Sequence, residues 1–259
     1  ADPNAEVRTQ AARTLGDVKH QAAGAEVVKL LQDESPRVQL HAAIALGRIK
    51  FRPAVAALVN LLRSNQSRDK YLRHAGVYAV GECAKKPAVL ALANDNDAAV
   101  RVAALLVLRR WNDLEVKRLL RDSDWALATE AARAINDLPL DEATTDLAGL
   151  ADSLLLNPEQ TPEALARRVI HANFRLGKSQ HAIAVARLAA NDEFSLPIRR
   201  EALGALADWS NPSQRDRVNG NWRPLQPRDT SIVRDAVQPQ LSALLNNCTG
   251  ELQVLVTQL

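Results

Sequence analysis

Apolar residues recur along this chain with the period of an α-helix. Val7, Ala11 and Leu15 lie four residues apart on one helical face, and residues 38–46 repeat the same spacing. Shorter apolar segments, such as residues 25–31, lie between these stretches. Each segment is too short to bury its apolar side alone, so it must pack against its neighbours. The pattern therefore predicts a chain of paired helices.

One apolar residue near the end of each longer helix serves as an anchor for aligning the repeats. The anchors are Leu15, Leu46, Val80, Leu108, Ile135, Leu176 and Leu206. Their mean spacing is about 32 residues, which is typical of helical solenoids. We predict an all-α fold: a right-handed α-solenoid superhelix of about seven helix pairs, followed by a divergent C-terminal cap.

The repeats carry the residues expected at helix ends. Asp2-Pro3 and Ser35-Pro36 each predict an N-cap followed by a proline at the first helical position. Gly16 and Gly47 are expected to end their helices in a left-handed conformation. The alanine pairs, such as Ala11-Ala12, would let neighbouring helices approach closely.

The segment from Asp2 to Gly16 reads D-x-x-x-x-V-R-x-x-A-A-x-x-L-G and resembles the HEAT repeat, in the short bacterial variety also seen in phycobilin lyases. The resemblance extends over residues 1–208. It implies a helical scaffold for protein interactions, and its motif contains no chemical signature.

Residues 209–229 interrupt the pattern with Pro, Gly and Asn, and they form a longer connection than is usual. A further helix is expected at 231–245 and a last apolar segment at 251–259. We therefore divide the chain into a HEAT-repeat solenoid (1–208) and a long Trp/Arg/Pro loop with a helical cap (209–259).

The second half is also similar to the HEAT region of large planctomycete-type proteins. The similarity rests on residues 134–139, 171–177 and 208–225. In those proteins the repeats lie between a sugar-dehydrogenase-like β-propeller and a C-terminal c-type cytochrome. The resemblance implies an interdomain scaffold in a secreted or periplasmic redox protein. No quinone or haem motif occurs in this chain, so no cofactor is expected.

Composition excludes several classes of protein. The chain has 259 residues, 47% of them apolar and 3% aromatic, with a net charge of +3, so it is neither a disordered tail nor an all-β protein. Its longest apolar stretch, residues 102–108, is too short to span a membrane. Cys83 and Cys248 form no paired motif, and the expected stack would keep them apart as free thiols.

Four arginines at similar repeat positions form a candidate ladder. They are Arg8, Arg73, Arg101 and Arg199. A basic stripe on a concave face would suit the phosphates of nucleic acid. The alternative, which we favour, is that each arginine pairs with an aspartate that opens its own or the adjacent repeat, such as Asp2, Asp33, Asp95 or Asp97. The small net charge supports this second interpretation.

The 209–229 loop carries the strongest candidates for an interaction site. They are Trp209, Arg215, Arg217, Trp222 and Arg223. Tryptophan and arginine dominate binding hot spots. The other interpretation is that the loop folds back and its tryptophans plug the end of the solenoid. We favour this plug, since two exposed tryptophans are costly unless a partner covers them.

No set of residues predicts catalysis or a metal site. His171 and His181 flank one turn with Asp192 and Glu193 nearby, but solvated or helix-capping histidines fit better. The remaining histidines are His20, His41 and His74. The acidic pair Asp122 and Asp124 before Trp125 could resemble a glycosylase site, although carboxylates at a helix start ordinarily complement the helix dipole.

We therefore expect a non-catalytic scaffold that contacts a protein or a flanking domain. A nucleic-acid-binding solenoid is the first alternative, and a HEAT-fold lyase or glycosylase is the second. We also expect the first repeat to leave an uncapped face that dimerises or abuts another domain.

Overall fold

The computed structural model describes residues 2–257, and their regular secondary structure is helical. The described chain forms two compact units, an N-terminal unit that ends at Glu115 and a C-terminal unit that begins at Val116. The predicted all-α fold is confirmed. The handedness of a superhelix over the whole chain and the division at residue 208 stay predictions.

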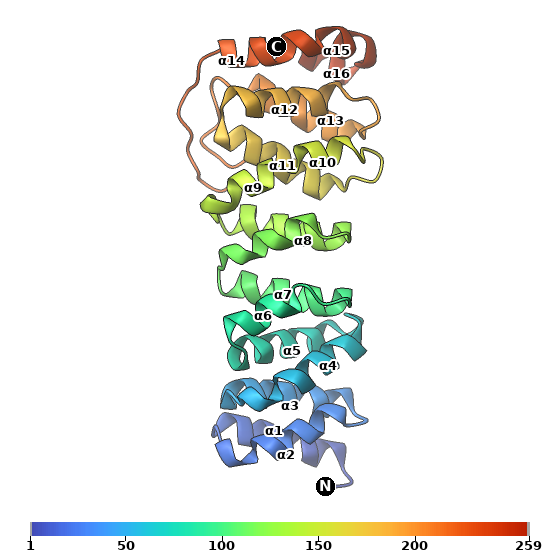
Figure 1. Ribbon diagram of the computed structural model, residues 1–259, viewed down its shortest axis with the longest axis vertical. Coiled ribbons are helices and arrows are strands. Elements are labelled where there is room, and N and C mark those ends of the chain that lie inside the picture. The colour runs from blue at the N-terminus through green and yellow to red at the C-terminus, as the bar shows by residue number, and fades with distance from the viewer. Residues whose placement is uncertain (1, 258–259) are drawn as a thin grey trace. The chain divides into compact units, whose positions relative to one another are not determined.

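The N-terminal unit consists of two layers of helices (Figure 1). The helices that carry the anchors form one layer: α1 (Ala5–Asp17), α3 (Pro36–Ile49), α5 (Lys70–Cys83) and α7 (Ala98–Arg110). We call these the anchor helices. The shorter helices form the other layer: α2 (Gly24–Lys29), α4 (Val55–Asn65) and α6 (Lys86–Leu92). Short 3₁₀ turns join several of them.

The same layout continues in the C-terminal unit. Its anchor helices are α8 (Trp125–Asp137), α11 (Glu163–Leu176) and α13 (Leu196–Ala207). The other layer contains α9 (Thr144–Ala148), α10 (Ala151–Leu155), α12 (Ser179–Ala190), α14 (Ser231–Val237) and α15 (Leu241–Asn247). The final helix, α16 (Glu251–Val256), packs on α13. The last two residues of the predicted 251–259 segment lie outside the described part.

Small residues bring the anchor helices of the N-terminal unit together. A Cβ atom on Gly16 would lie 2.7 Å from Cα of Ala45, and one on Gly47 would lie 2.6 Å from a ring carbon of Tyr78. Real Cβ atoms essentially never come this close, so a larger residue at either position would force its neighbour to shift. Leu46 of α3 and Leu58 of α4 are fully buried.

Two expectations about helix ends were wrong. Gly16 and Gly47 lie inside their helices, where they provide close packing, and the left-handed residues after those helices are Lys19 (φ 51°) and Lys50 (φ 59°). The N-cap of α1 is Asn4, whose side chain accepts a hydrogen bond from the Glu6 N–H. Ser35 and Pro36 do begin α3 as predicted.

Candidate functional site

The first arginine of the ladder makes the expected bond between repeats. Arg8 donates from Nε and Nη2 to the two carboxylate oxygens of Asp33, at 2.7 and 2.9 Å. Its Nη1 donates to the backbone oxygens of Asp2 and Pro3. The paired geometry holds α1 to the turn that precedes α3.

The other ladder arginines differ from one another. Arg101 donates to the backbone oxygens of Asp95 and Asn96, at 3.0 and 3.1 Å. Arg73 forms no hydrogen bond or ion pair through its side chain within residues 2–257. The carboxylate of Asp95 instead accepts from Arg63, at 3.0 Å, an arginine that sequence reasoning missed because it lies in the other layer.

Arg199 is nearly fully buried and holds the C-terminal helices. It donates to the backbone oxygens of Ala189 and Asn247 and to Sγ of Cys248. The expectation of an aspartate partner was therefore wrong for Arg199. Arg8, Arg101 and Arg199 thus each donate hydrogen bonds within the chain.

Both cysteines are buried free thiols. The Cys83 thiol donates to the backbone oxygen of Leu46, at 3.4 Å, and burial raises the pKa of this thiol to about 11. A thiol with such a pKa stays protonated at neutral pH, so Cys83 is not a candidate nucleophile.

The connection between α13 and α14, residues 208–230, runs back along the C-terminal unit; we call it the strap (Figure 1). Trp209 is fully buried, and its ring meets that of Phe174 edge-on, with the ring centres 5.5 Å apart. The guanidinium of Arg228 covers both rings, at 5.1 and 5.2 Å. Gly177, at φ 68°, leaves room for it, since a Cβ atom there would lie 2.5 Å from the guanidinium carbon. Trp209 therefore fixes the start of the strap.

Trp222, in contrast, is 66% exposed at the tip of the strap, where it pairs with Arg215 in a short antiparallel bridge. The side chain of Arg215 donates to the backbone oxygen of Gly220 at the same tip. The predicted plug is thus wrong for Trp222. Trp209, in contrast, is buried as the plug requires, and its ring packs on Phe174 of α11.

A buried polar network holds the middle of the strap. Asp216 lies with one carboxylate oxygen 2.9 Å from Nε2 of His171 and 3.0 Å from Nη1 of Arg223. Its other oxygen accepts from the backbone N–H groups of Val218 and Asn219. Arg223 also donates to Asp141, at 2.7 Å. These bonds join the strap to α11 and to the turn after α8.

The pKa values of Asp216 and His171 are both lowered, but for different reasons. Burial alone raises the pKa of Asp216, but the hydrogen bond and charge of His171, with the two backbone N–H groups, outweigh it and hold that pKa well below its usual range. Burial lowers the pKa of His171, and Asp216 offsets only part of this effect. His171 is therefore neutral at pH 7, and it was wrongly expected to be a solvated or capping residue.

His181 does act at a helix end, since its Nδ1 accepts from the Lys178 N–H, at 3.3 Å. Asp124 caps α8 by accepting from the Ala126 N–H, as expected, and Asp122 accepts from the Asp124 N–H. Within the described residues, no group of three or more His, Cys, Asp or Glu side chains could hold a metal ion. No described helix is long and apolar enough to cross a membrane.

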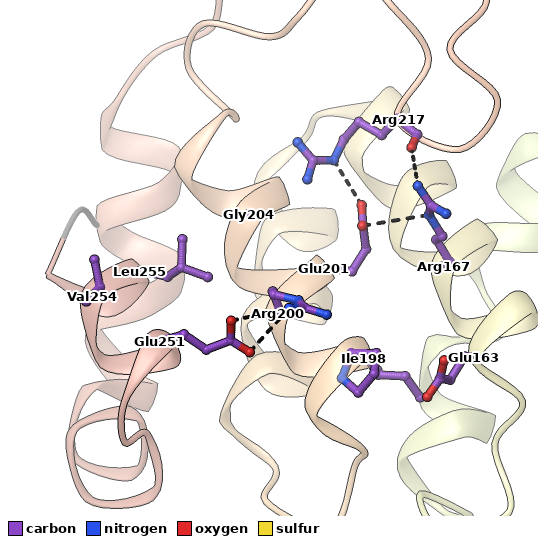
Figure 2. Close-up of a pocket in the computed structure, with 11 residues that line it drawn as sticks. Glu163, Arg167, Ile198, Arg200, Glu201, Gly204, Arg217, Glu251, Val254 and Leu255 are labelled. Carbon is purple, nitrogen blue, oxygen red and sulfur yellow. Dashed lines mark hydrogen bonds and ion pairs between the residues drawn. The ribbon is translucent and has the colours of Figure 1, made fainter.

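A groove of about 710 Å³ lies between α11, α13 and α16 (Figure 2). Part of its lining is apolar: Pro197, Ile198, Val254 and Leu255. Gly204 forms part of the floor, where a Cβ atom would meet only the tip of Arg217, at 3.0 Å. Such a mixture of apolar lining and a few polar groups is typical of binding sites.

Ion pairs line the charged side of this groove. Arg217 of the strap donates from Nε to Glu201 of α13, at 3.0 Å, and it also bonds Asp208. Arg167 of α11 approaches the same Glu201, at 3.7 Å, and donates to the backbone oxygen of Arg217 (Figure 2). Arg200 pairs with Glu251 of α16, at 3.2 Å.

Sequence reasoning found only Arg217 among these groove residues. Arg167 and Glu201 occur in consecutive repeats with opposite charge, a pattern that could have suggested a pair. Nothing in the sequence predicts that α16 would pack on one end of α13 and leave a groove.

In a comparison with known proteins, one family matches the beginning of the chain. Residues 1–81 match the family described as HEAT repeats. The matched residues contain α1 to α4 and most of α5. No curated protein matches this sequence.

Several solved structures are similar to the chain. One is the complex of CpcE and CpcF of phycocyanin lyase from Nostoc sp. PCC7120, with 20% identity and a TM-score of 0.38, over 92% of this chain and 91% of that one. Two engineered proteins match all of this chain: one with 17% identity and a TM-score of 0.33 over 75% of its own length, the other with 19% identity and a TM-score of 0.23 over 92%. Sequence identities and TM-scores this low support no conclusion about function.

Proposed function

We propose that this chain is a non-catalytic scaffold that binds another protein, and that the groove between α11, α13 and α16 takes an amphipathic helix of that partner. The observation that carries the proposal is the groove itself. It places an apolar wall, an open glycine floor and a rim of ion pairs on one side of the C-terminal unit.

A helix fits this groove because the anchor helices pack side by side within each unit. In the C-terminal unit α11 packs between α8 and α13, whereas α13 has α11 on one side and the shorter α16 on the other. Helix α13 spans 12 residues and α16 only six. Gly204 is only half-buried and Ala207 at the end of α13 is exposed, so a partner helix could extend the layer there.

The charges around the groove favour a protein over nucleic acid. Arg167, Arg200 and Arg217 are balanced by Glu163, Glu201 and Glu251. A balanced rim gives little attraction for phosphates, which need an excess of positive charge. Among the described residues that line it there is no histidine, cysteine or hydroxyl side chain, so these residues offer few groups for catalysis. Apolar contact would supply the affinity, and the rim would set the orientation.

The proposal can be tested by cross-linking followed by direct binding. A photoreactive residue at Val254, which is 59% exposed, should cross-link a helical segment of a partner. A synthetic peptide of that segment should then bind the purified chain, as measured by fluorescence anisotropy. Gly204→Leu should fill the groove and weaken binding at least tenfold.

Gly149→Leu is the matched control, because Gly149 is exposed in the same unit and a Cβ atom there meets only ordinary contacts, at 3.5 Å and beyond. This variant should bind the peptide like the unchanged chain. Equal affinity of the Gly204→Leu variant, or a peptide that fails to bind the purified chain, would overturn the proposal.

The finer proposal is that the scaffold joins domains of a larger redox protein. It is supported by the similarity of residues 134–139, 171–177 and 208–225 to planctomycete-type proteins. The test is the sequence on either side of this chain in its gene. A downstream CxxCH motif with an upstream β-propeller would support it, and flanking sequence without either would overturn it.

A further inference from the structure

The middle of the strap, residues 211–227, is a loop whose two ends lie together. At its base the backbone N–H of Arg228 donates to the backbone oxygen of Ser210, at 2.9 Å. The buried ring of Trp209 contacts Phe174 of α11 and the Arg228 guanidinium, so the same base is held against the helices. The loop can therefore separate from the helices without pulling its ends apart.

Polar bonds hold this loop against the C-terminal unit. Between residues 211 and 227 only Pro212 and Asp216 are buried. The loop is joined to the helices by hydrogen bonds and ion pairs of Asp216, Arg217 and Arg223. A segment with few buried apolar contacts opens at a small cost in free energy. Whether the loop stays closed thus depends on its polar bonds, above all on those of the buried Asp216.

His171 of α11 is the titratable partner of Asp216. The two side chains are 1% and 0% exposed, and Nε2 of His171 lies 2.9 Å from the carboxylate. An ionised carboxylate only accepts hydrogen bonds, so Nε2 carries the proton of the neutral ring. The other ring nitrogen, Nδ1, is buried and has no hydrogen-bond partner among the described residues. Protonation would place a second N–H there, with no acceptor for it among those residues.

The charges around His171 give little support to a protonated ring. Arg223 of the strap already pairs with Asp216, at 3.0 Å, and with Asp141, while Arg175 of α11 adds a further positive charge. Helix α12 contributes Arg187 and a second histidine, His181. The carboxylates on the other helices packed against α11 each pair with an arginine or lysine: Glu130, Asp137, Asp146, Asp152 and Glu201.

We infer that His171 and Asp216 form an acid-sensitive latch, in which protonation of His171 opens residues 211–227 from the helices while the helices stay folded. The open loop exposes the ring, which then takes up a proton near its ordinary pKa, whereas burial lowers the pKa of the ring in the closed form. Falling pH therefore favours the open loop. Opening also withdraws Arg217 from Glu201 at the rim of the groove. The inference concerns this chain alone and does not require the proposed partner.

Hydrogen exchange measured by nuclear magnetic resonance tests the latch at single amides. The N–H groups of Val218 and Asn219 donate to Asp216, so their protection factors, corrected for the intrinsic exchange rate, report on the closed loop. From pH 7 to pH 5 these factors should fall by between about fivefold and 25-fold, the upper limit being set by a ring that titrates near pH 6.5 when open. The Ile170 amide, in the middle of α11, should be protected about tenfold more strongly or better at both pH values, because it exchanges only when the unit unfolds.

Two variants show whether His171 is responsible. His171→Gln keeps an N–H donor for Asp216 but takes up no proton, so protection of Val218 and Asn219 should differ by less than about twofold between pH 7 and pH 5. His181→Gln is the matched control, because it removes another histidine of the same unit whose pKa burial lowers. This variant should keep the full response. Circular dichroism checks that both variants are folded.

The ring resonances of His171 in the unchanged chain give a measurement that needs no variant, and they should titrate below the ordinary range of a histidine. Titration above that range would overturn the inference. Protection of Val218 and Asn219 that is constant or higher at pH 5, or equal to that of Ile170, would also overturn it. A response that persists in a folded His171→Gln variant, or that disappears in His181→Gln, would do the same.

Discussion

The two units of this chain share one helix layout but rely on different interactions. In the N-terminal unit, neighbouring anchor helices meet through small residues, with Gly16 against Ala45 and Gly47 against Tyr78. In the C-terminal unit, the strap adds a buried aromatic contact at Trp209 and a buried polar network around Asp216. A regular stack can be held by neighbour contacts alone. The irregular C-terminal unit also relies on specific long-range contacts. Different substitutions should therefore destabilise the two units.

The largest expected effect is in the C-terminal unit. Trp209→Ala removes a fully buried ring from its contact with Phe174 and Arg228, so we expect a loss of about 3–5 kcal/mol in the free energy of unfolding. Trp222→Ala, at a 66% exposed position, should change it by less than about 0.5 kcal/mol. Urea unfolding followed by circular dichroism measures both. Similar losses for the two variants would mean that the strap is not anchored through Trp209.

The second effect is smaller and belongs to the N-terminal unit. Gly16→Ala places a Cβ atom 2.7 Å from the Ala45 backbone, and such overpacking costs about 1–3 kcal/mol. At Gly81 the nearest atom would be 3.7 Å away, so Gly81→Ala should stabilise α5 by up to about 1 kcal/mol through helix propensity. A lower urea midpoint for Gly16→Ala and a higher one for Gly81→Ala would support close approach of the helices at Gly16. A stabilising Gly16→Ala change would contradict it.

The smallest expected effect is a difference between the two units in how their stability depends on pH. Because burial lowers the pKa of His171, the unfolded chain binds a proton below about pH 6.5 that the folded unit excludes. The C-terminal unit should therefore lose stability as the pH falls from 7 to 5. The lowered pKa of Asp216 adds a further loss only below about pH 4, since this carboxylate stabilises the fold at any higher pH.

Amide hydrogen exchange in α11 and α3, corrected for the intrinsic rate at each pH, measures this difference. His41 in the N-terminal unit also has a pKa lowered by burial, but its ring is only partly buried. The variant His41→Gln removes that contribution. In this variant α11 should lose protection at pH 5 while α3 keeps it. Equal loss in both helices would show that the buried network does not control the acid response.

The anchors Leu46 and Val80 are buried, as apolar spacing predicts. In α1 the spacing was a poorer guide, since Leu15 is only half-buried and Val7 is 48% exposed. The pairing of Arg8 with the aspartate that opens the next repeat was also predictable, since both residues recur at fixed repeat positions. The functions of Gly16 and Gly47 were not, because a glycine near a helix end can serve either as a left-handed stop or as a close-packing position. Which of the two applies depends on the neighbouring helix.

The candidate site was less predictable than the fold. The loop with Trp209 and Trp222 was recognised from its composition, but one tryptophan is buried and the other is exposed. Arg217 was predicted as an interaction residue, yet the groove it lines also needs Glu201 of α13 and Glu251 of α16. These residues lie far apart in the sequence and share no repeat position, so only their packing brings them together.

By itself, the sequence determined that this protein consists of stacked helix pairs, because apolar spacing and repeat length are local properties that each segment carries. Only the tertiary structure decided where a partly apolar surface stays uncovered, as in the groove beside α13. The reason is physical. Whether an apolar or charged side chain is buried depends on which other helix covers it, and that is set by contacts between distant parts of the chain.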